Sequence, residues 1–211
     1  MHPRLTVVDH PLAARHLAVL RDRFTPSPTF RAVLSDVSML LLYEALRDLR
    51  VDDTTVETPL EPAPARRLAD DIVVVAIMRA GLGMVDGALR LVPEARVGHL
   101  GVYRDEEALR PVNYYESLPP GLGGSEVVVV DPMLATGGSA VHALDVVKRS
   151  GPARVRLVCL VAAPEGLEAL AKAHPDVPVT VAAVDDHLDE RGYIRPGLGD
   201  AGDRLFGTTE D

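Results

Sequence analysis

Residues 127–139 combine an apolar strand with a loop whose composition suits an anion. Four valines lead to Asp131, and the loop that follows carries Thr136, two glycines and Ser139. Consecutive β-branched residues are typical of a strand buried on both faces of a parallel sheet, and open α/β sheets bind ligands at the carboxyl ends of their strands. Small side chains, hydroxyl groups and backbone N–H groups at the start of a helix favour a phosphate. The pattern therefore predicts a phosphate site, with Asp131 placed for hydroxyl groups or a metal.

This loop differs from the common nucleotide-binding motifs, because it lacks the lysine and spacing of a P-loop and is not a G-x-G-x-x-G fingerprint. The string V-D-P-M-L-A-T-G-G-S instead resembles the phosphoribosyl diphosphate (PRPP) loop of type I phosphoribosyltransferases. It is most similar to the loop of the uracil phosphoribosyltransferase family, which carries a proline at the same step. The alternative interpretation is a strand, turn and helix in which the glycines only permit the backbone conformation and bind no phosphate. Within this loop the resemblance assigns PRPP binding to Asp131, Pro132, Met133, Leu134, Ala135, Thr136, Gly137, Gly138 and Ser139.

A second buried strand, residues 71–78, runs into the string R-A-G-L-G-M and then into a predicted helix. An arginine at the end of a strand pairs strongly with phosphate oxygens in apolar surroundings, although a lone arginine there is more often a surface charge. The segment is similar to the pyrophosphate-contacting loop of the same family, which implies that Arg79 binds PRPP. The superfamily often has a non-proline cis peptide in this loop, and we expect it between Arg79 and Ala80.

A third strand, residues 96–102, leads into a long polar and aromatic stretch, residues 103–119, that reads as a flap. Long functional loops often act as lids, which suits a reaction that must exclude water. The string Y-R-D-E resembles the family at this point, and the resemblance implies that Arg104 reaches the diphosphate. Tyr114 and Tyr115 are either part of the flap or simple packing residues on a hairpin.

The tail of the chain, residues 192–208, has five glycines and no strong periodicity, so composition alone predicts a loop. Glycines let backbone N–H and C=O groups approach a small planar ligand closely. The string G-Y-I-R-P-G-L-G-D-A-G-D-R-L-F-G-T is the most specific part of the resemblance to the uracil phosphoribosyltransferase family. It implies that uracil lies against Ile194, Gly199, Asp200 and Ala201, with Asp200 facing PRPP.

The composition excludes some other classes of function. The chain has 22 Lys and Arg against 31 Asp and Glu, a net charge of −9 that opposes general nucleic-acid binding. Its longest apolar runs are far shorter than the roughly 18 residues of a membrane span, so we expect a soluble, cytoplasmic protein. The one cysteine, Cys159, lies in an apolar run and is expected to be a buried thiol.

Strands alternate with helices along the chain, which predicts an α/β fold with a doubly wound, mostly parallel sheet flanked by helices. We expect one domain over residues 1–211. Its predicted parts are an N-terminal arm (about residues 1–50), a core (about 51–184) carrying the flap, and a C-terminal hood (about 185–211) that forms the base pocket.

Five local predictions concern segments outside the phosphate loops. A helix from His10-Pro11 to about Phe24 is expected to bury one face, and Thr29 is expected to cap a second helix that continues to about Leu49. The apolar group of residues 39–42 in that helix belongs to the core or to a subunit contact. Residues 58–64 read as a surface loop, and the carboxylates of residues 185–190 read as a solvated loop rather than a metal cage. The predicted face of the first helix comprises Leu12, His16, Val19, Leu20 and Phe24.

The resemblance implies the reaction of uracil with PRPP to give UMP and pyrophosphate, with Mg²⁺ carried on PRPP and no direct protein ligands to the metal. The catalytic residues it implies are Asp131, Asp200 and Arg104, and Asp200 is the nearest candidate for a general base. It further implies a homodimer or higher homo-oligomer and a GTP effector, as in some relatives. Two alternatives share the phosphate loop. A PRPP-binding regulator of pyrimidine genes would need a basic RNA-facing surface, and a non-catalytic nucleotide-binding module would not need residues 192–208.

Overall fold

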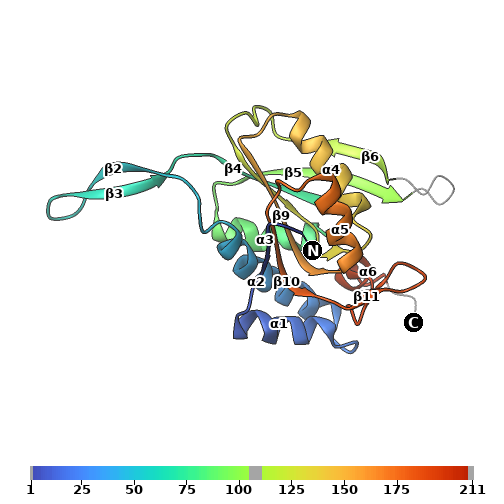
Figure 1. Cartoon of the computed structure of the whole chain (residues 1–211). Coiled ribbons are helices and arrows are strands. Elements are labelled where there is room, and N and C mark those ends of the chain that lie inside the picture. Colours follow the sequence, from blue (N-terminus) through green and yellow to red (C-terminus); the bar gives the residue numbers. More distant parts are fainter. Residues whose placement is uncertain (1, 105–110, 209–211) are drawn as a thin grey trace.

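A twisted sheet of mostly parallel strands forms the centre of the structure, a computed structural model that describes residues 2–104 and 111–208 and leaves the side chains of residues 103–113 undescribed (Figure 1). Among the described residues the strand order is β1-β10-β9-β7-β4-β5-β6, with β8 beside β9, and only β6 is antiparallel to its neighbour. This agrees with the predicted doubly wound sheet. The strands are β1 (Leu5–Val7), β4 (Ile72–Met78), β5 (Arg96–Arg104), β6 (Pro111–Ser117), β7 (Glu126–Val130), β8 (Met133–Leu134), β9 (Arg154–Ala162) and β10 (Val179–Val184).

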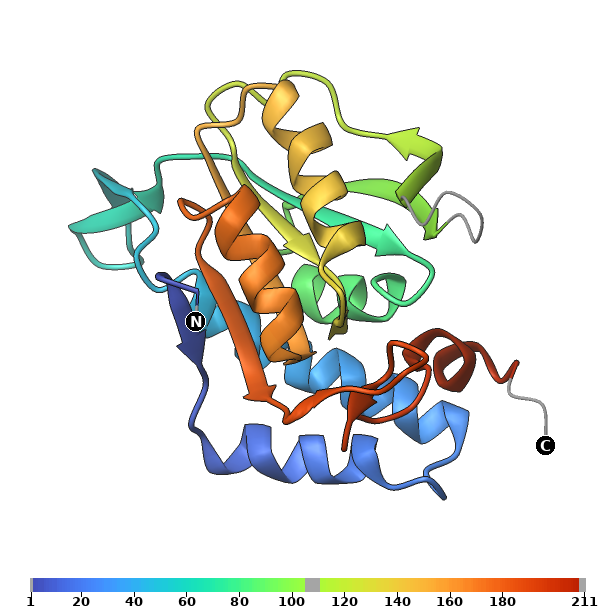
Figure 2. The same ribbon diagram turned by 45° about the vertical axis from the view of Figure 1, so that its right-hand side comes forward.

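Helices cover both faces of this sheet, as the alternation of elements predicts (Figure 2). On one face α1 (Pro11–Arg21), α2 (Ser27–Ala45) and α3 (Leu82–Leu91) share a hydrophobic core with β4, β7 and β9. On the other face α4 (Gly138–Arg149) and α5 (Pro164–Ala173) share a second core with the same strands. The valines of β7 are fully buried because their side chains alternate between these two cores. The short helix α6 (Ala201–Phe206) lies against α2 at the end of the described chain.

The first helix ends at Arg21, before the predicted Phe24, and buries only part of the predicted face, of which Leu20 is buried and His16 and Val19 are half-buried. Its buried residues are Ala13, Leu17 and Leu20, whereas Leu12 and Phe24 of the predicted face are 48% and 80% exposed. Apolar residues occur around most of the circumference of α1, so helical spacing alone does not fix which face turns inward.

The second helix starts earlier than predicted. The residue at its N-cap is Pro26, no side chain caps it, and Thr29 lies inside its first turn, so the predicted cap is wrong. Proline is well suited to the start of a helix because its missing N–H has no intrahelical partner there anyway. Within residues 39–42, Leu41 and Leu42 are buried, which confirms the core interpretation for those two.

The predicted surface loop at residues 58–64 is confirmed for residues 58–61, whereas residues 62–64 are strand. β2 (Val51–Glu57) and β3 (Pro62–Leu68) pair as an antiparallel hairpin that projects from the body of the molecule (Figure 1). The turn is limited to residues 58–61, where the hydroxyl of Thr58 donates to Glu61 O at 2.7 Å. Two prolines fit in β3 because each strand of a lone hairpin has an open edge that needs no N–H donor. We call this hairpin the β2–β3 arm.

None of the helices in the described part of the chain is long and apolar enough to cross a membrane.

Candidate active site

A small pocket of about 250 Å³ lies at the carboxyl ends of β4 and β7, where the sheet meets the C-terminal segment. Open α/β sheets bind their ligands at this edge. The pocket joins residues from both predicted halves of the site, although about sixty residues of sequence separate those halves. Its lining from the predicted set consists of Asp131, Met133, Ala135, Ile194, Gly199, Asp200 and Ala201, and its other lining residues are Ala80, Gly192, Tyr193 and Gly202.

The rest of the predicted PRPP loop continues from this pocket into α4. Gly137 stands at the N-cap of α4 with φ of +82°, a left-handed conformation that glycine adopts without steric cost. Ala135 enters the pocket, and the following residues present the first N–H groups of the helix beside it. The preceding residues hold the loop on the sheet, because Pro132 O accepts from Val161 N at 3.0 Å and Leu134 O accepts from Ala163 N at 2.9 Å.

Close backbone contact with α5 holds the loop from its other side. Gly166, in the first turn of α5, lies so near the loop that an added Cβ would be 2.3 Å from Ala135 O. A Cβ on Gly137 would in turn be 3.0 Å from Gly166 O. The loop is therefore held between β9 and α5, and its shape does not depend on its own side chains.

Two carboxylates face the same pocket. Asp131 directly follows β7, and its Oδ1 accepts from Met133 N at 3.3 Å. Burial is the main cause that raises the pKa of Asp131 to about 7, and the nearby negative charge of Asp200 adds to this shift. Asp200 has a second, structural role, since it is the N-cap of α6 and accepts from Asp203 N at 2.8 Å. Asparagine is an equally good residue at a helix N-cap, so the charge of Asp200 is not needed for the cap.

Arg79 follows β4, and its guanidinium donates to Asp203 Oδ1 at 3.0 Å. Asp203 also accepts from the hydroxyl of Thr208 at 2.7 Å. Arg79 does not line the pocket, but it lies beside the lining residue Gly202, because an added Cβ on Gly202 would be 3.8 Å from Arg79 Nη2. Asp203 was not among the predicted site residues, although it lies in the glycine-rich string at the end of the chain. The non-proline cis peptide joins Met78 and Arg79, one bond earlier than predicted, so that prediction was wrong by one residue.

Arg104, the other arginine assigned to the diphosphate, is the last residue of β5, and the structure does not describe its side chain. Residues 105–110 of the predicted flap also lie outside the described residues. The described part of the flap is β6, which pairs with β5. Gly101 of β5 makes room for the ring of Tyr114, since an added Cβ would be 2.6 Å from Tyr114 Cζ. Tyr114 therefore packs across the hairpin, in agreement with the packing alternative.

The acidic stretch at residues 185–190 is only partly a solvated loop. Asp186 and Glu190 are exposed, but Asp185 is buried against Arg21, with N–O distances of 2.5 and 2.8 Å. Asp189 accepts from Tyr193 N at 2.9 Å and pairs with an arginine of the same hairpin. The prediction was therefore wrong for these two residues, whose partners closed the segment into a folded hairpin of β11 (His187–Leu188) and β12 (Ile194–Arg195). In the described part of the chain no three His, Cys, Asp or Glu side chains gather as they would around a metal.

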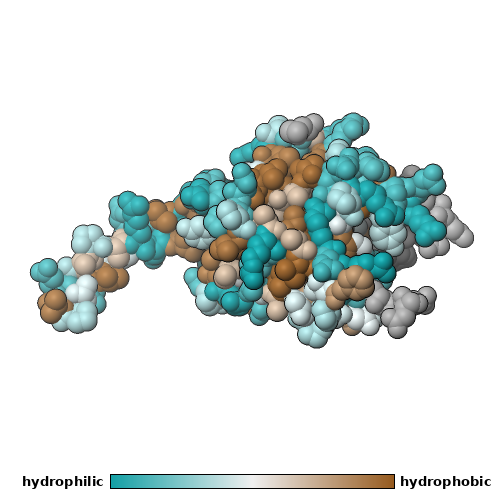
Figure 3. Space-filling view, turned by 90° about the horizontal axis from the view of Figure 1, so that it is seen from below, coloured by the Kyte–Doolittle hydropathy of each residue, from teal (hydrophilic) through white to brown (hydrophobic). Residues whose placement is uncertain are grey.

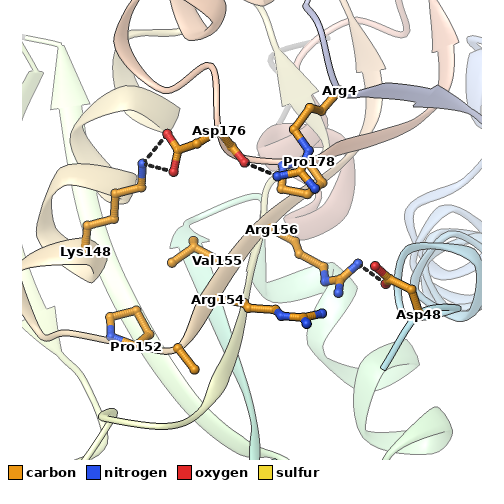
Figure 4. A pocket seen from close by; sticks show the side chains of 10 residues that line it. Arg4, Asp48, Lys148, Pro152, Arg154, Val155, Arg156, Asp176 and Pro178 are labelled. Atoms are coloured by element: carbon orange, nitrogen blue, oxygen red, sulfur yellow. Dashed lines mark hydrogen bonds and ion pairs between the residues drawn. The ribbon is translucent and has the colours of Figure 1, made fainter. Parts of the chain in front are cut away.

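A larger hollow of about 520 Å³ lies at the opposite ends of the strands (Figure 4). Its charged groups are mostly engaged with one another. Lys148 contacts both carboxylate oxygens of Asp176, at 2.8 and 2.9 Å, and Arg156 pairs with Asp48 at 2.6 Å. This hollow is lined by structural ion pairs, so the pocket at the carboxyl ends of the strands is the better candidate for chemistry.

Replacing Asp131 with asparagine should remove one source of pH-dependent stability. The pKa of Asp131 lies at about 7 in the folded chain and at 3.8 ordinarily, so the folded state binds this proton more tightly than the unfolded state. This group therefore lowers the free energy of unfolding as the pH rises from about 4 to about 7. We expect Asp131→Asn to gain stability relative to the natural chain over that range, measured by urea unfolding at several pH values. The exposed Asp53→Asn is the control, and a difference for Asp131→Asn that stays constant with pH would contradict this account.

Comparison with known proteins identifies the family. A family model described as uracil phosphoribosyltransferase matches residues 7–208. The chain is 56% identical over 206 residues to the uracil phosphoribosyltransferase of Salinibacter ruber, with 98% of both chains covered. It is 55% identical over 206 residues to that of Thermus thermophilus, with 97% of this chain and 99% of the relative covered.

Solved structures agree with this result. A protein of Aquifex aeolicus, AQ2163, has a TM-score of 0.93 and 39% identity, covering 98% of this chain and 100% of its own. A hypoxanthine-guanine phosphoribosyltransferase of Bacillus anthracis has a TM-score of 0.53 and 13% identity, covering 73% of this chain and 79% of its own, which shows a shared fold alone. The family model and the full-length relatives together show that the chain belongs to the uracil phosphoribosyltransferase family.

Proposed function

We propose that this chain converts uracil and PRPP to UMP and pyrophosphate. A bond forms between N1 of uracil and C1 of the ribose, the bond from C1 to the diphosphate oxygen breaks, and N1 loses its proton. One observation carries the proposal. The pocket joins Asp131 and the start of the phosphate loop to Ile194, Gly199 and Ala201, the residues assigned to uracil. A non-catalytic nucleotide-binding module would not need this second half of the pocket.

The phosphate loop is our proposed site for the 5′-phosphate of PRPP. Residues 135–139 offer backbone N–H groups at the N-terminus of α4, and the helix dipole favours a negative charge there. This arrangement needs no cationic side chain, which agrees with a chain whose net charge is −9. Asp131, next to the loop, is our candidate for accepting hydrogen bonds from the ribose hydroxyls.

The diphosphate is our proposed ligand for Arg79 and Arg104. Arg79 is bound to Asp203 beside the pocket residue Gly202, and a more highly charged diphosphate would compete with that carboxylate for its guanidinium. Mg²⁺ held on the diphosphate would neutralise the charge that develops as the leaving group departs. We propose that PRPP carries this metal without direct protein ligands, and the two carboxylates that line the pocket, Asp131 and Asp200, would supply favourable negative charge near it.

Uracil is our proposed ligand for the hood side of the pocket. Gly199 has φ of +79° and no side chain, so its backbone groups face the space beside Asp200. Uracil presents two carbonyl acceptors with an N–H between them, and backbone groups match that pattern. Cytosine replaces one acceptor by an amine donor and would leave a backbone group of the pocket unpaired.

We also infer that the chain acts as one domain in this reaction. Its parts are the N-terminal arm (residues 1–50), the core (51–184) and the hood (185–211).

The test is the formation of UMP from radiolabelled uracil and PRPP. We expect product only when both substrates and Mg²⁺ are present. Cytosine should be used at least about 10⁴-fold less well, because a mismatched buried hydrogen-bond partner discriminates on that scale. Product from cytosine at a comparable rate, or product without PRPP, would contradict the proposal. Adding GTP to the same assay tests the proposed effector, and fractionation of cells that express the chain tests a cytoplasmic location.

Asp200→Asn should separate a catalytic carboxylate from a structural one. The asparagine keeps the N-cap of α6, so we expect a folded protein with an unchanged melting temperature. Loss of a transition-state contact lowers kcat and kcat/KM together, so kcat should fall more than either KM rises. Steady-state kinetics with each substrate varied in turn measure this. If only the KM for PRPP changes, Asp200 is a binding residue and not a general base.

The β2–β3 arm supports a homo-oligomer. It projects from the body with hydrophobic residues among its polar ones (Figures 1 and 3), including Val56 at 47% exposure and Leu60 at 94%. An isolated two-stranded hairpin is at best marginally stable in water, so a second copy of the chain is the occupant we propose for this surface. We expect sedimentation velocity to give a species larger than the 22.6 kDa chain, and Val56→Asp to dissociate it. A monomeric natural chain would contradict this inference.

A further inference from the structure

One residue of the hood, Gly197, has both its backbone N–H and its backbone C=O bound by the members of a single ion pair. We define the base loop as residues 194–199, which begins at Ile194 and ends at Gly199, two of the pocket residues. In the middle of the base loop, Gly197 N donates to Asp185 Oδ2 at 2.9 Å. Gly197 O accepts from Arg21 Nη1 at 2.8 Å. Both polar groups of Gly197 are therefore fixed by side chains from other elements.

Arg21 and Asp185 also bind each other through two hydrogen bonds. Arg21 Nη2 lies 2.5 Å from Asp185 Oδ1, and Arg21 Nη1 lies 2.8 Å from Asp185 Oδ2. The fork of an arginine matches a carboxylate in this geometry and fixes orientation as well as distance. The side chain of Asp185 is 4% exposed, so water does not compete freely for the pair.

The two partners lie at the ends of regular elements outside the base loop. Arg21 is the last residue of α1, and Asp185 follows β10, where its N–H donates to Ala162 O at 2.8 Å. Neither residue lines the pocket. Gly197 itself has φ of +61°, and an added Cβ would be 2.1 Å from Ile194 O, so the base loop is folded tightly on itself. The position of Gly197 relative to the core thus determines where Ile194 and Gly199 face the pocket.

We propose that Arg21 and Asp185 are positioning residues for uracil, which set the base loop at the distance from Asp131 and Asp200 that the base requires. The proposal rests on the function proposed above. The pair contacts only the hood side of the site, and the phosphate loop is held separately by β9 and α5. Loosening the pair should therefore weaken the binding of uracil and leave the binding of PRPP unchanged.

Arg21→Lys is the central test, because lysine keeps the charge and loses the fork. We expect the KM for uracil to rise by about tenfold or more, the factor for one lost charged hydrogen bond, with the KM for PRPP within about twofold of the natural value. Asp185→Asn should act in the same direction. The double variant should lose little more than the worse single variant, because residues of one network are not additive.

Arg47→Lys is the matched control. Arg47 binds Glu44 through a similar fork, with N–O distances of 2.9 and 2.5 Å, on a surface away from the pocket. It should change neither KM. If Arg21→Lys lowers only the melting temperature, or raises both KM values alike, the pair is merely structural and the proposal is overturned.

Hydrogen exchange separates this proposal from the proposed function. In the substrate-free protein, amides of the base loop should exchange faster in Arg21→Lys and at the natural rate in Arg47→Lys. Unchanged exchange in Arg21→Lys would overturn the positioning role, whatever the activity. Suppose that the natural chain forms no UMP but that Arg21→Lys shows faster exchange. The proposed function is then overturned, whereas the role of the Arg21–Asp185 pair in holding the base loop is supported.

Discussion

The candidate site depends on how closely other backbone segments approach the carboxyl end of β7. An added Cβ on Gly81, just after β4, would lie 2.5 Å from Val130 O, and one on Gly166 would lie 2.3 Å from Ala135 O. A side chain at Gly81 would push its loop away from β7, and a side chain at Gly166 would push α5 away from the loop that follows Asp131. Because backbone groups themselves form these contacts, the phosphate loop is already shaped before any ligand arrives, which reduces the entropy lost on binding.

Charge in the site follows a similar logic, because Arg79 and Asp200 each have a partner within the protein. Arg79 pairs with Asp203, and Asp200 caps α6. No cationic side chain of the described residues pairs with Asp131, and burial raises its pKa to about 7. Because the net charge is −9, an anion at this site would have to be attracted by local groups such as helix N–H groups rather than by the overall field of the protein.

Local patterns in the sequence allowed most of the sheet to be predicted, and the family resemblance named seven of the residues that line the pocket. Runs such as residues 127–130 specify a strand buried on both faces, and the glycine-rich strings mark the loops at its end. The features that were missed depend on distant partners. Asp185 reads as solvated until Arg21, 164 residues away, is placed beside it. The buried face of α1 likewise depends on what packs against it, and the β2–β3 arm carries prolines that normally indicate a loop.

The tail is fastened to the start of the chain by Arg204. Its guanidinium binds Leu20 O and, at 2.6 Å, Asp22 O, both at the end of α1. It also donates to Leu198 O of the base loop at 2.8 Å. During synthesis on the ribosome, the phosphate loop and its strand emerge long before Arg204 does. The contacts of Arg204 with α1 and the base loop can therefore form only after residue 204 has been made, and a chain that stopped before residue 192 would retain the phosphate loop without the base loop beside it.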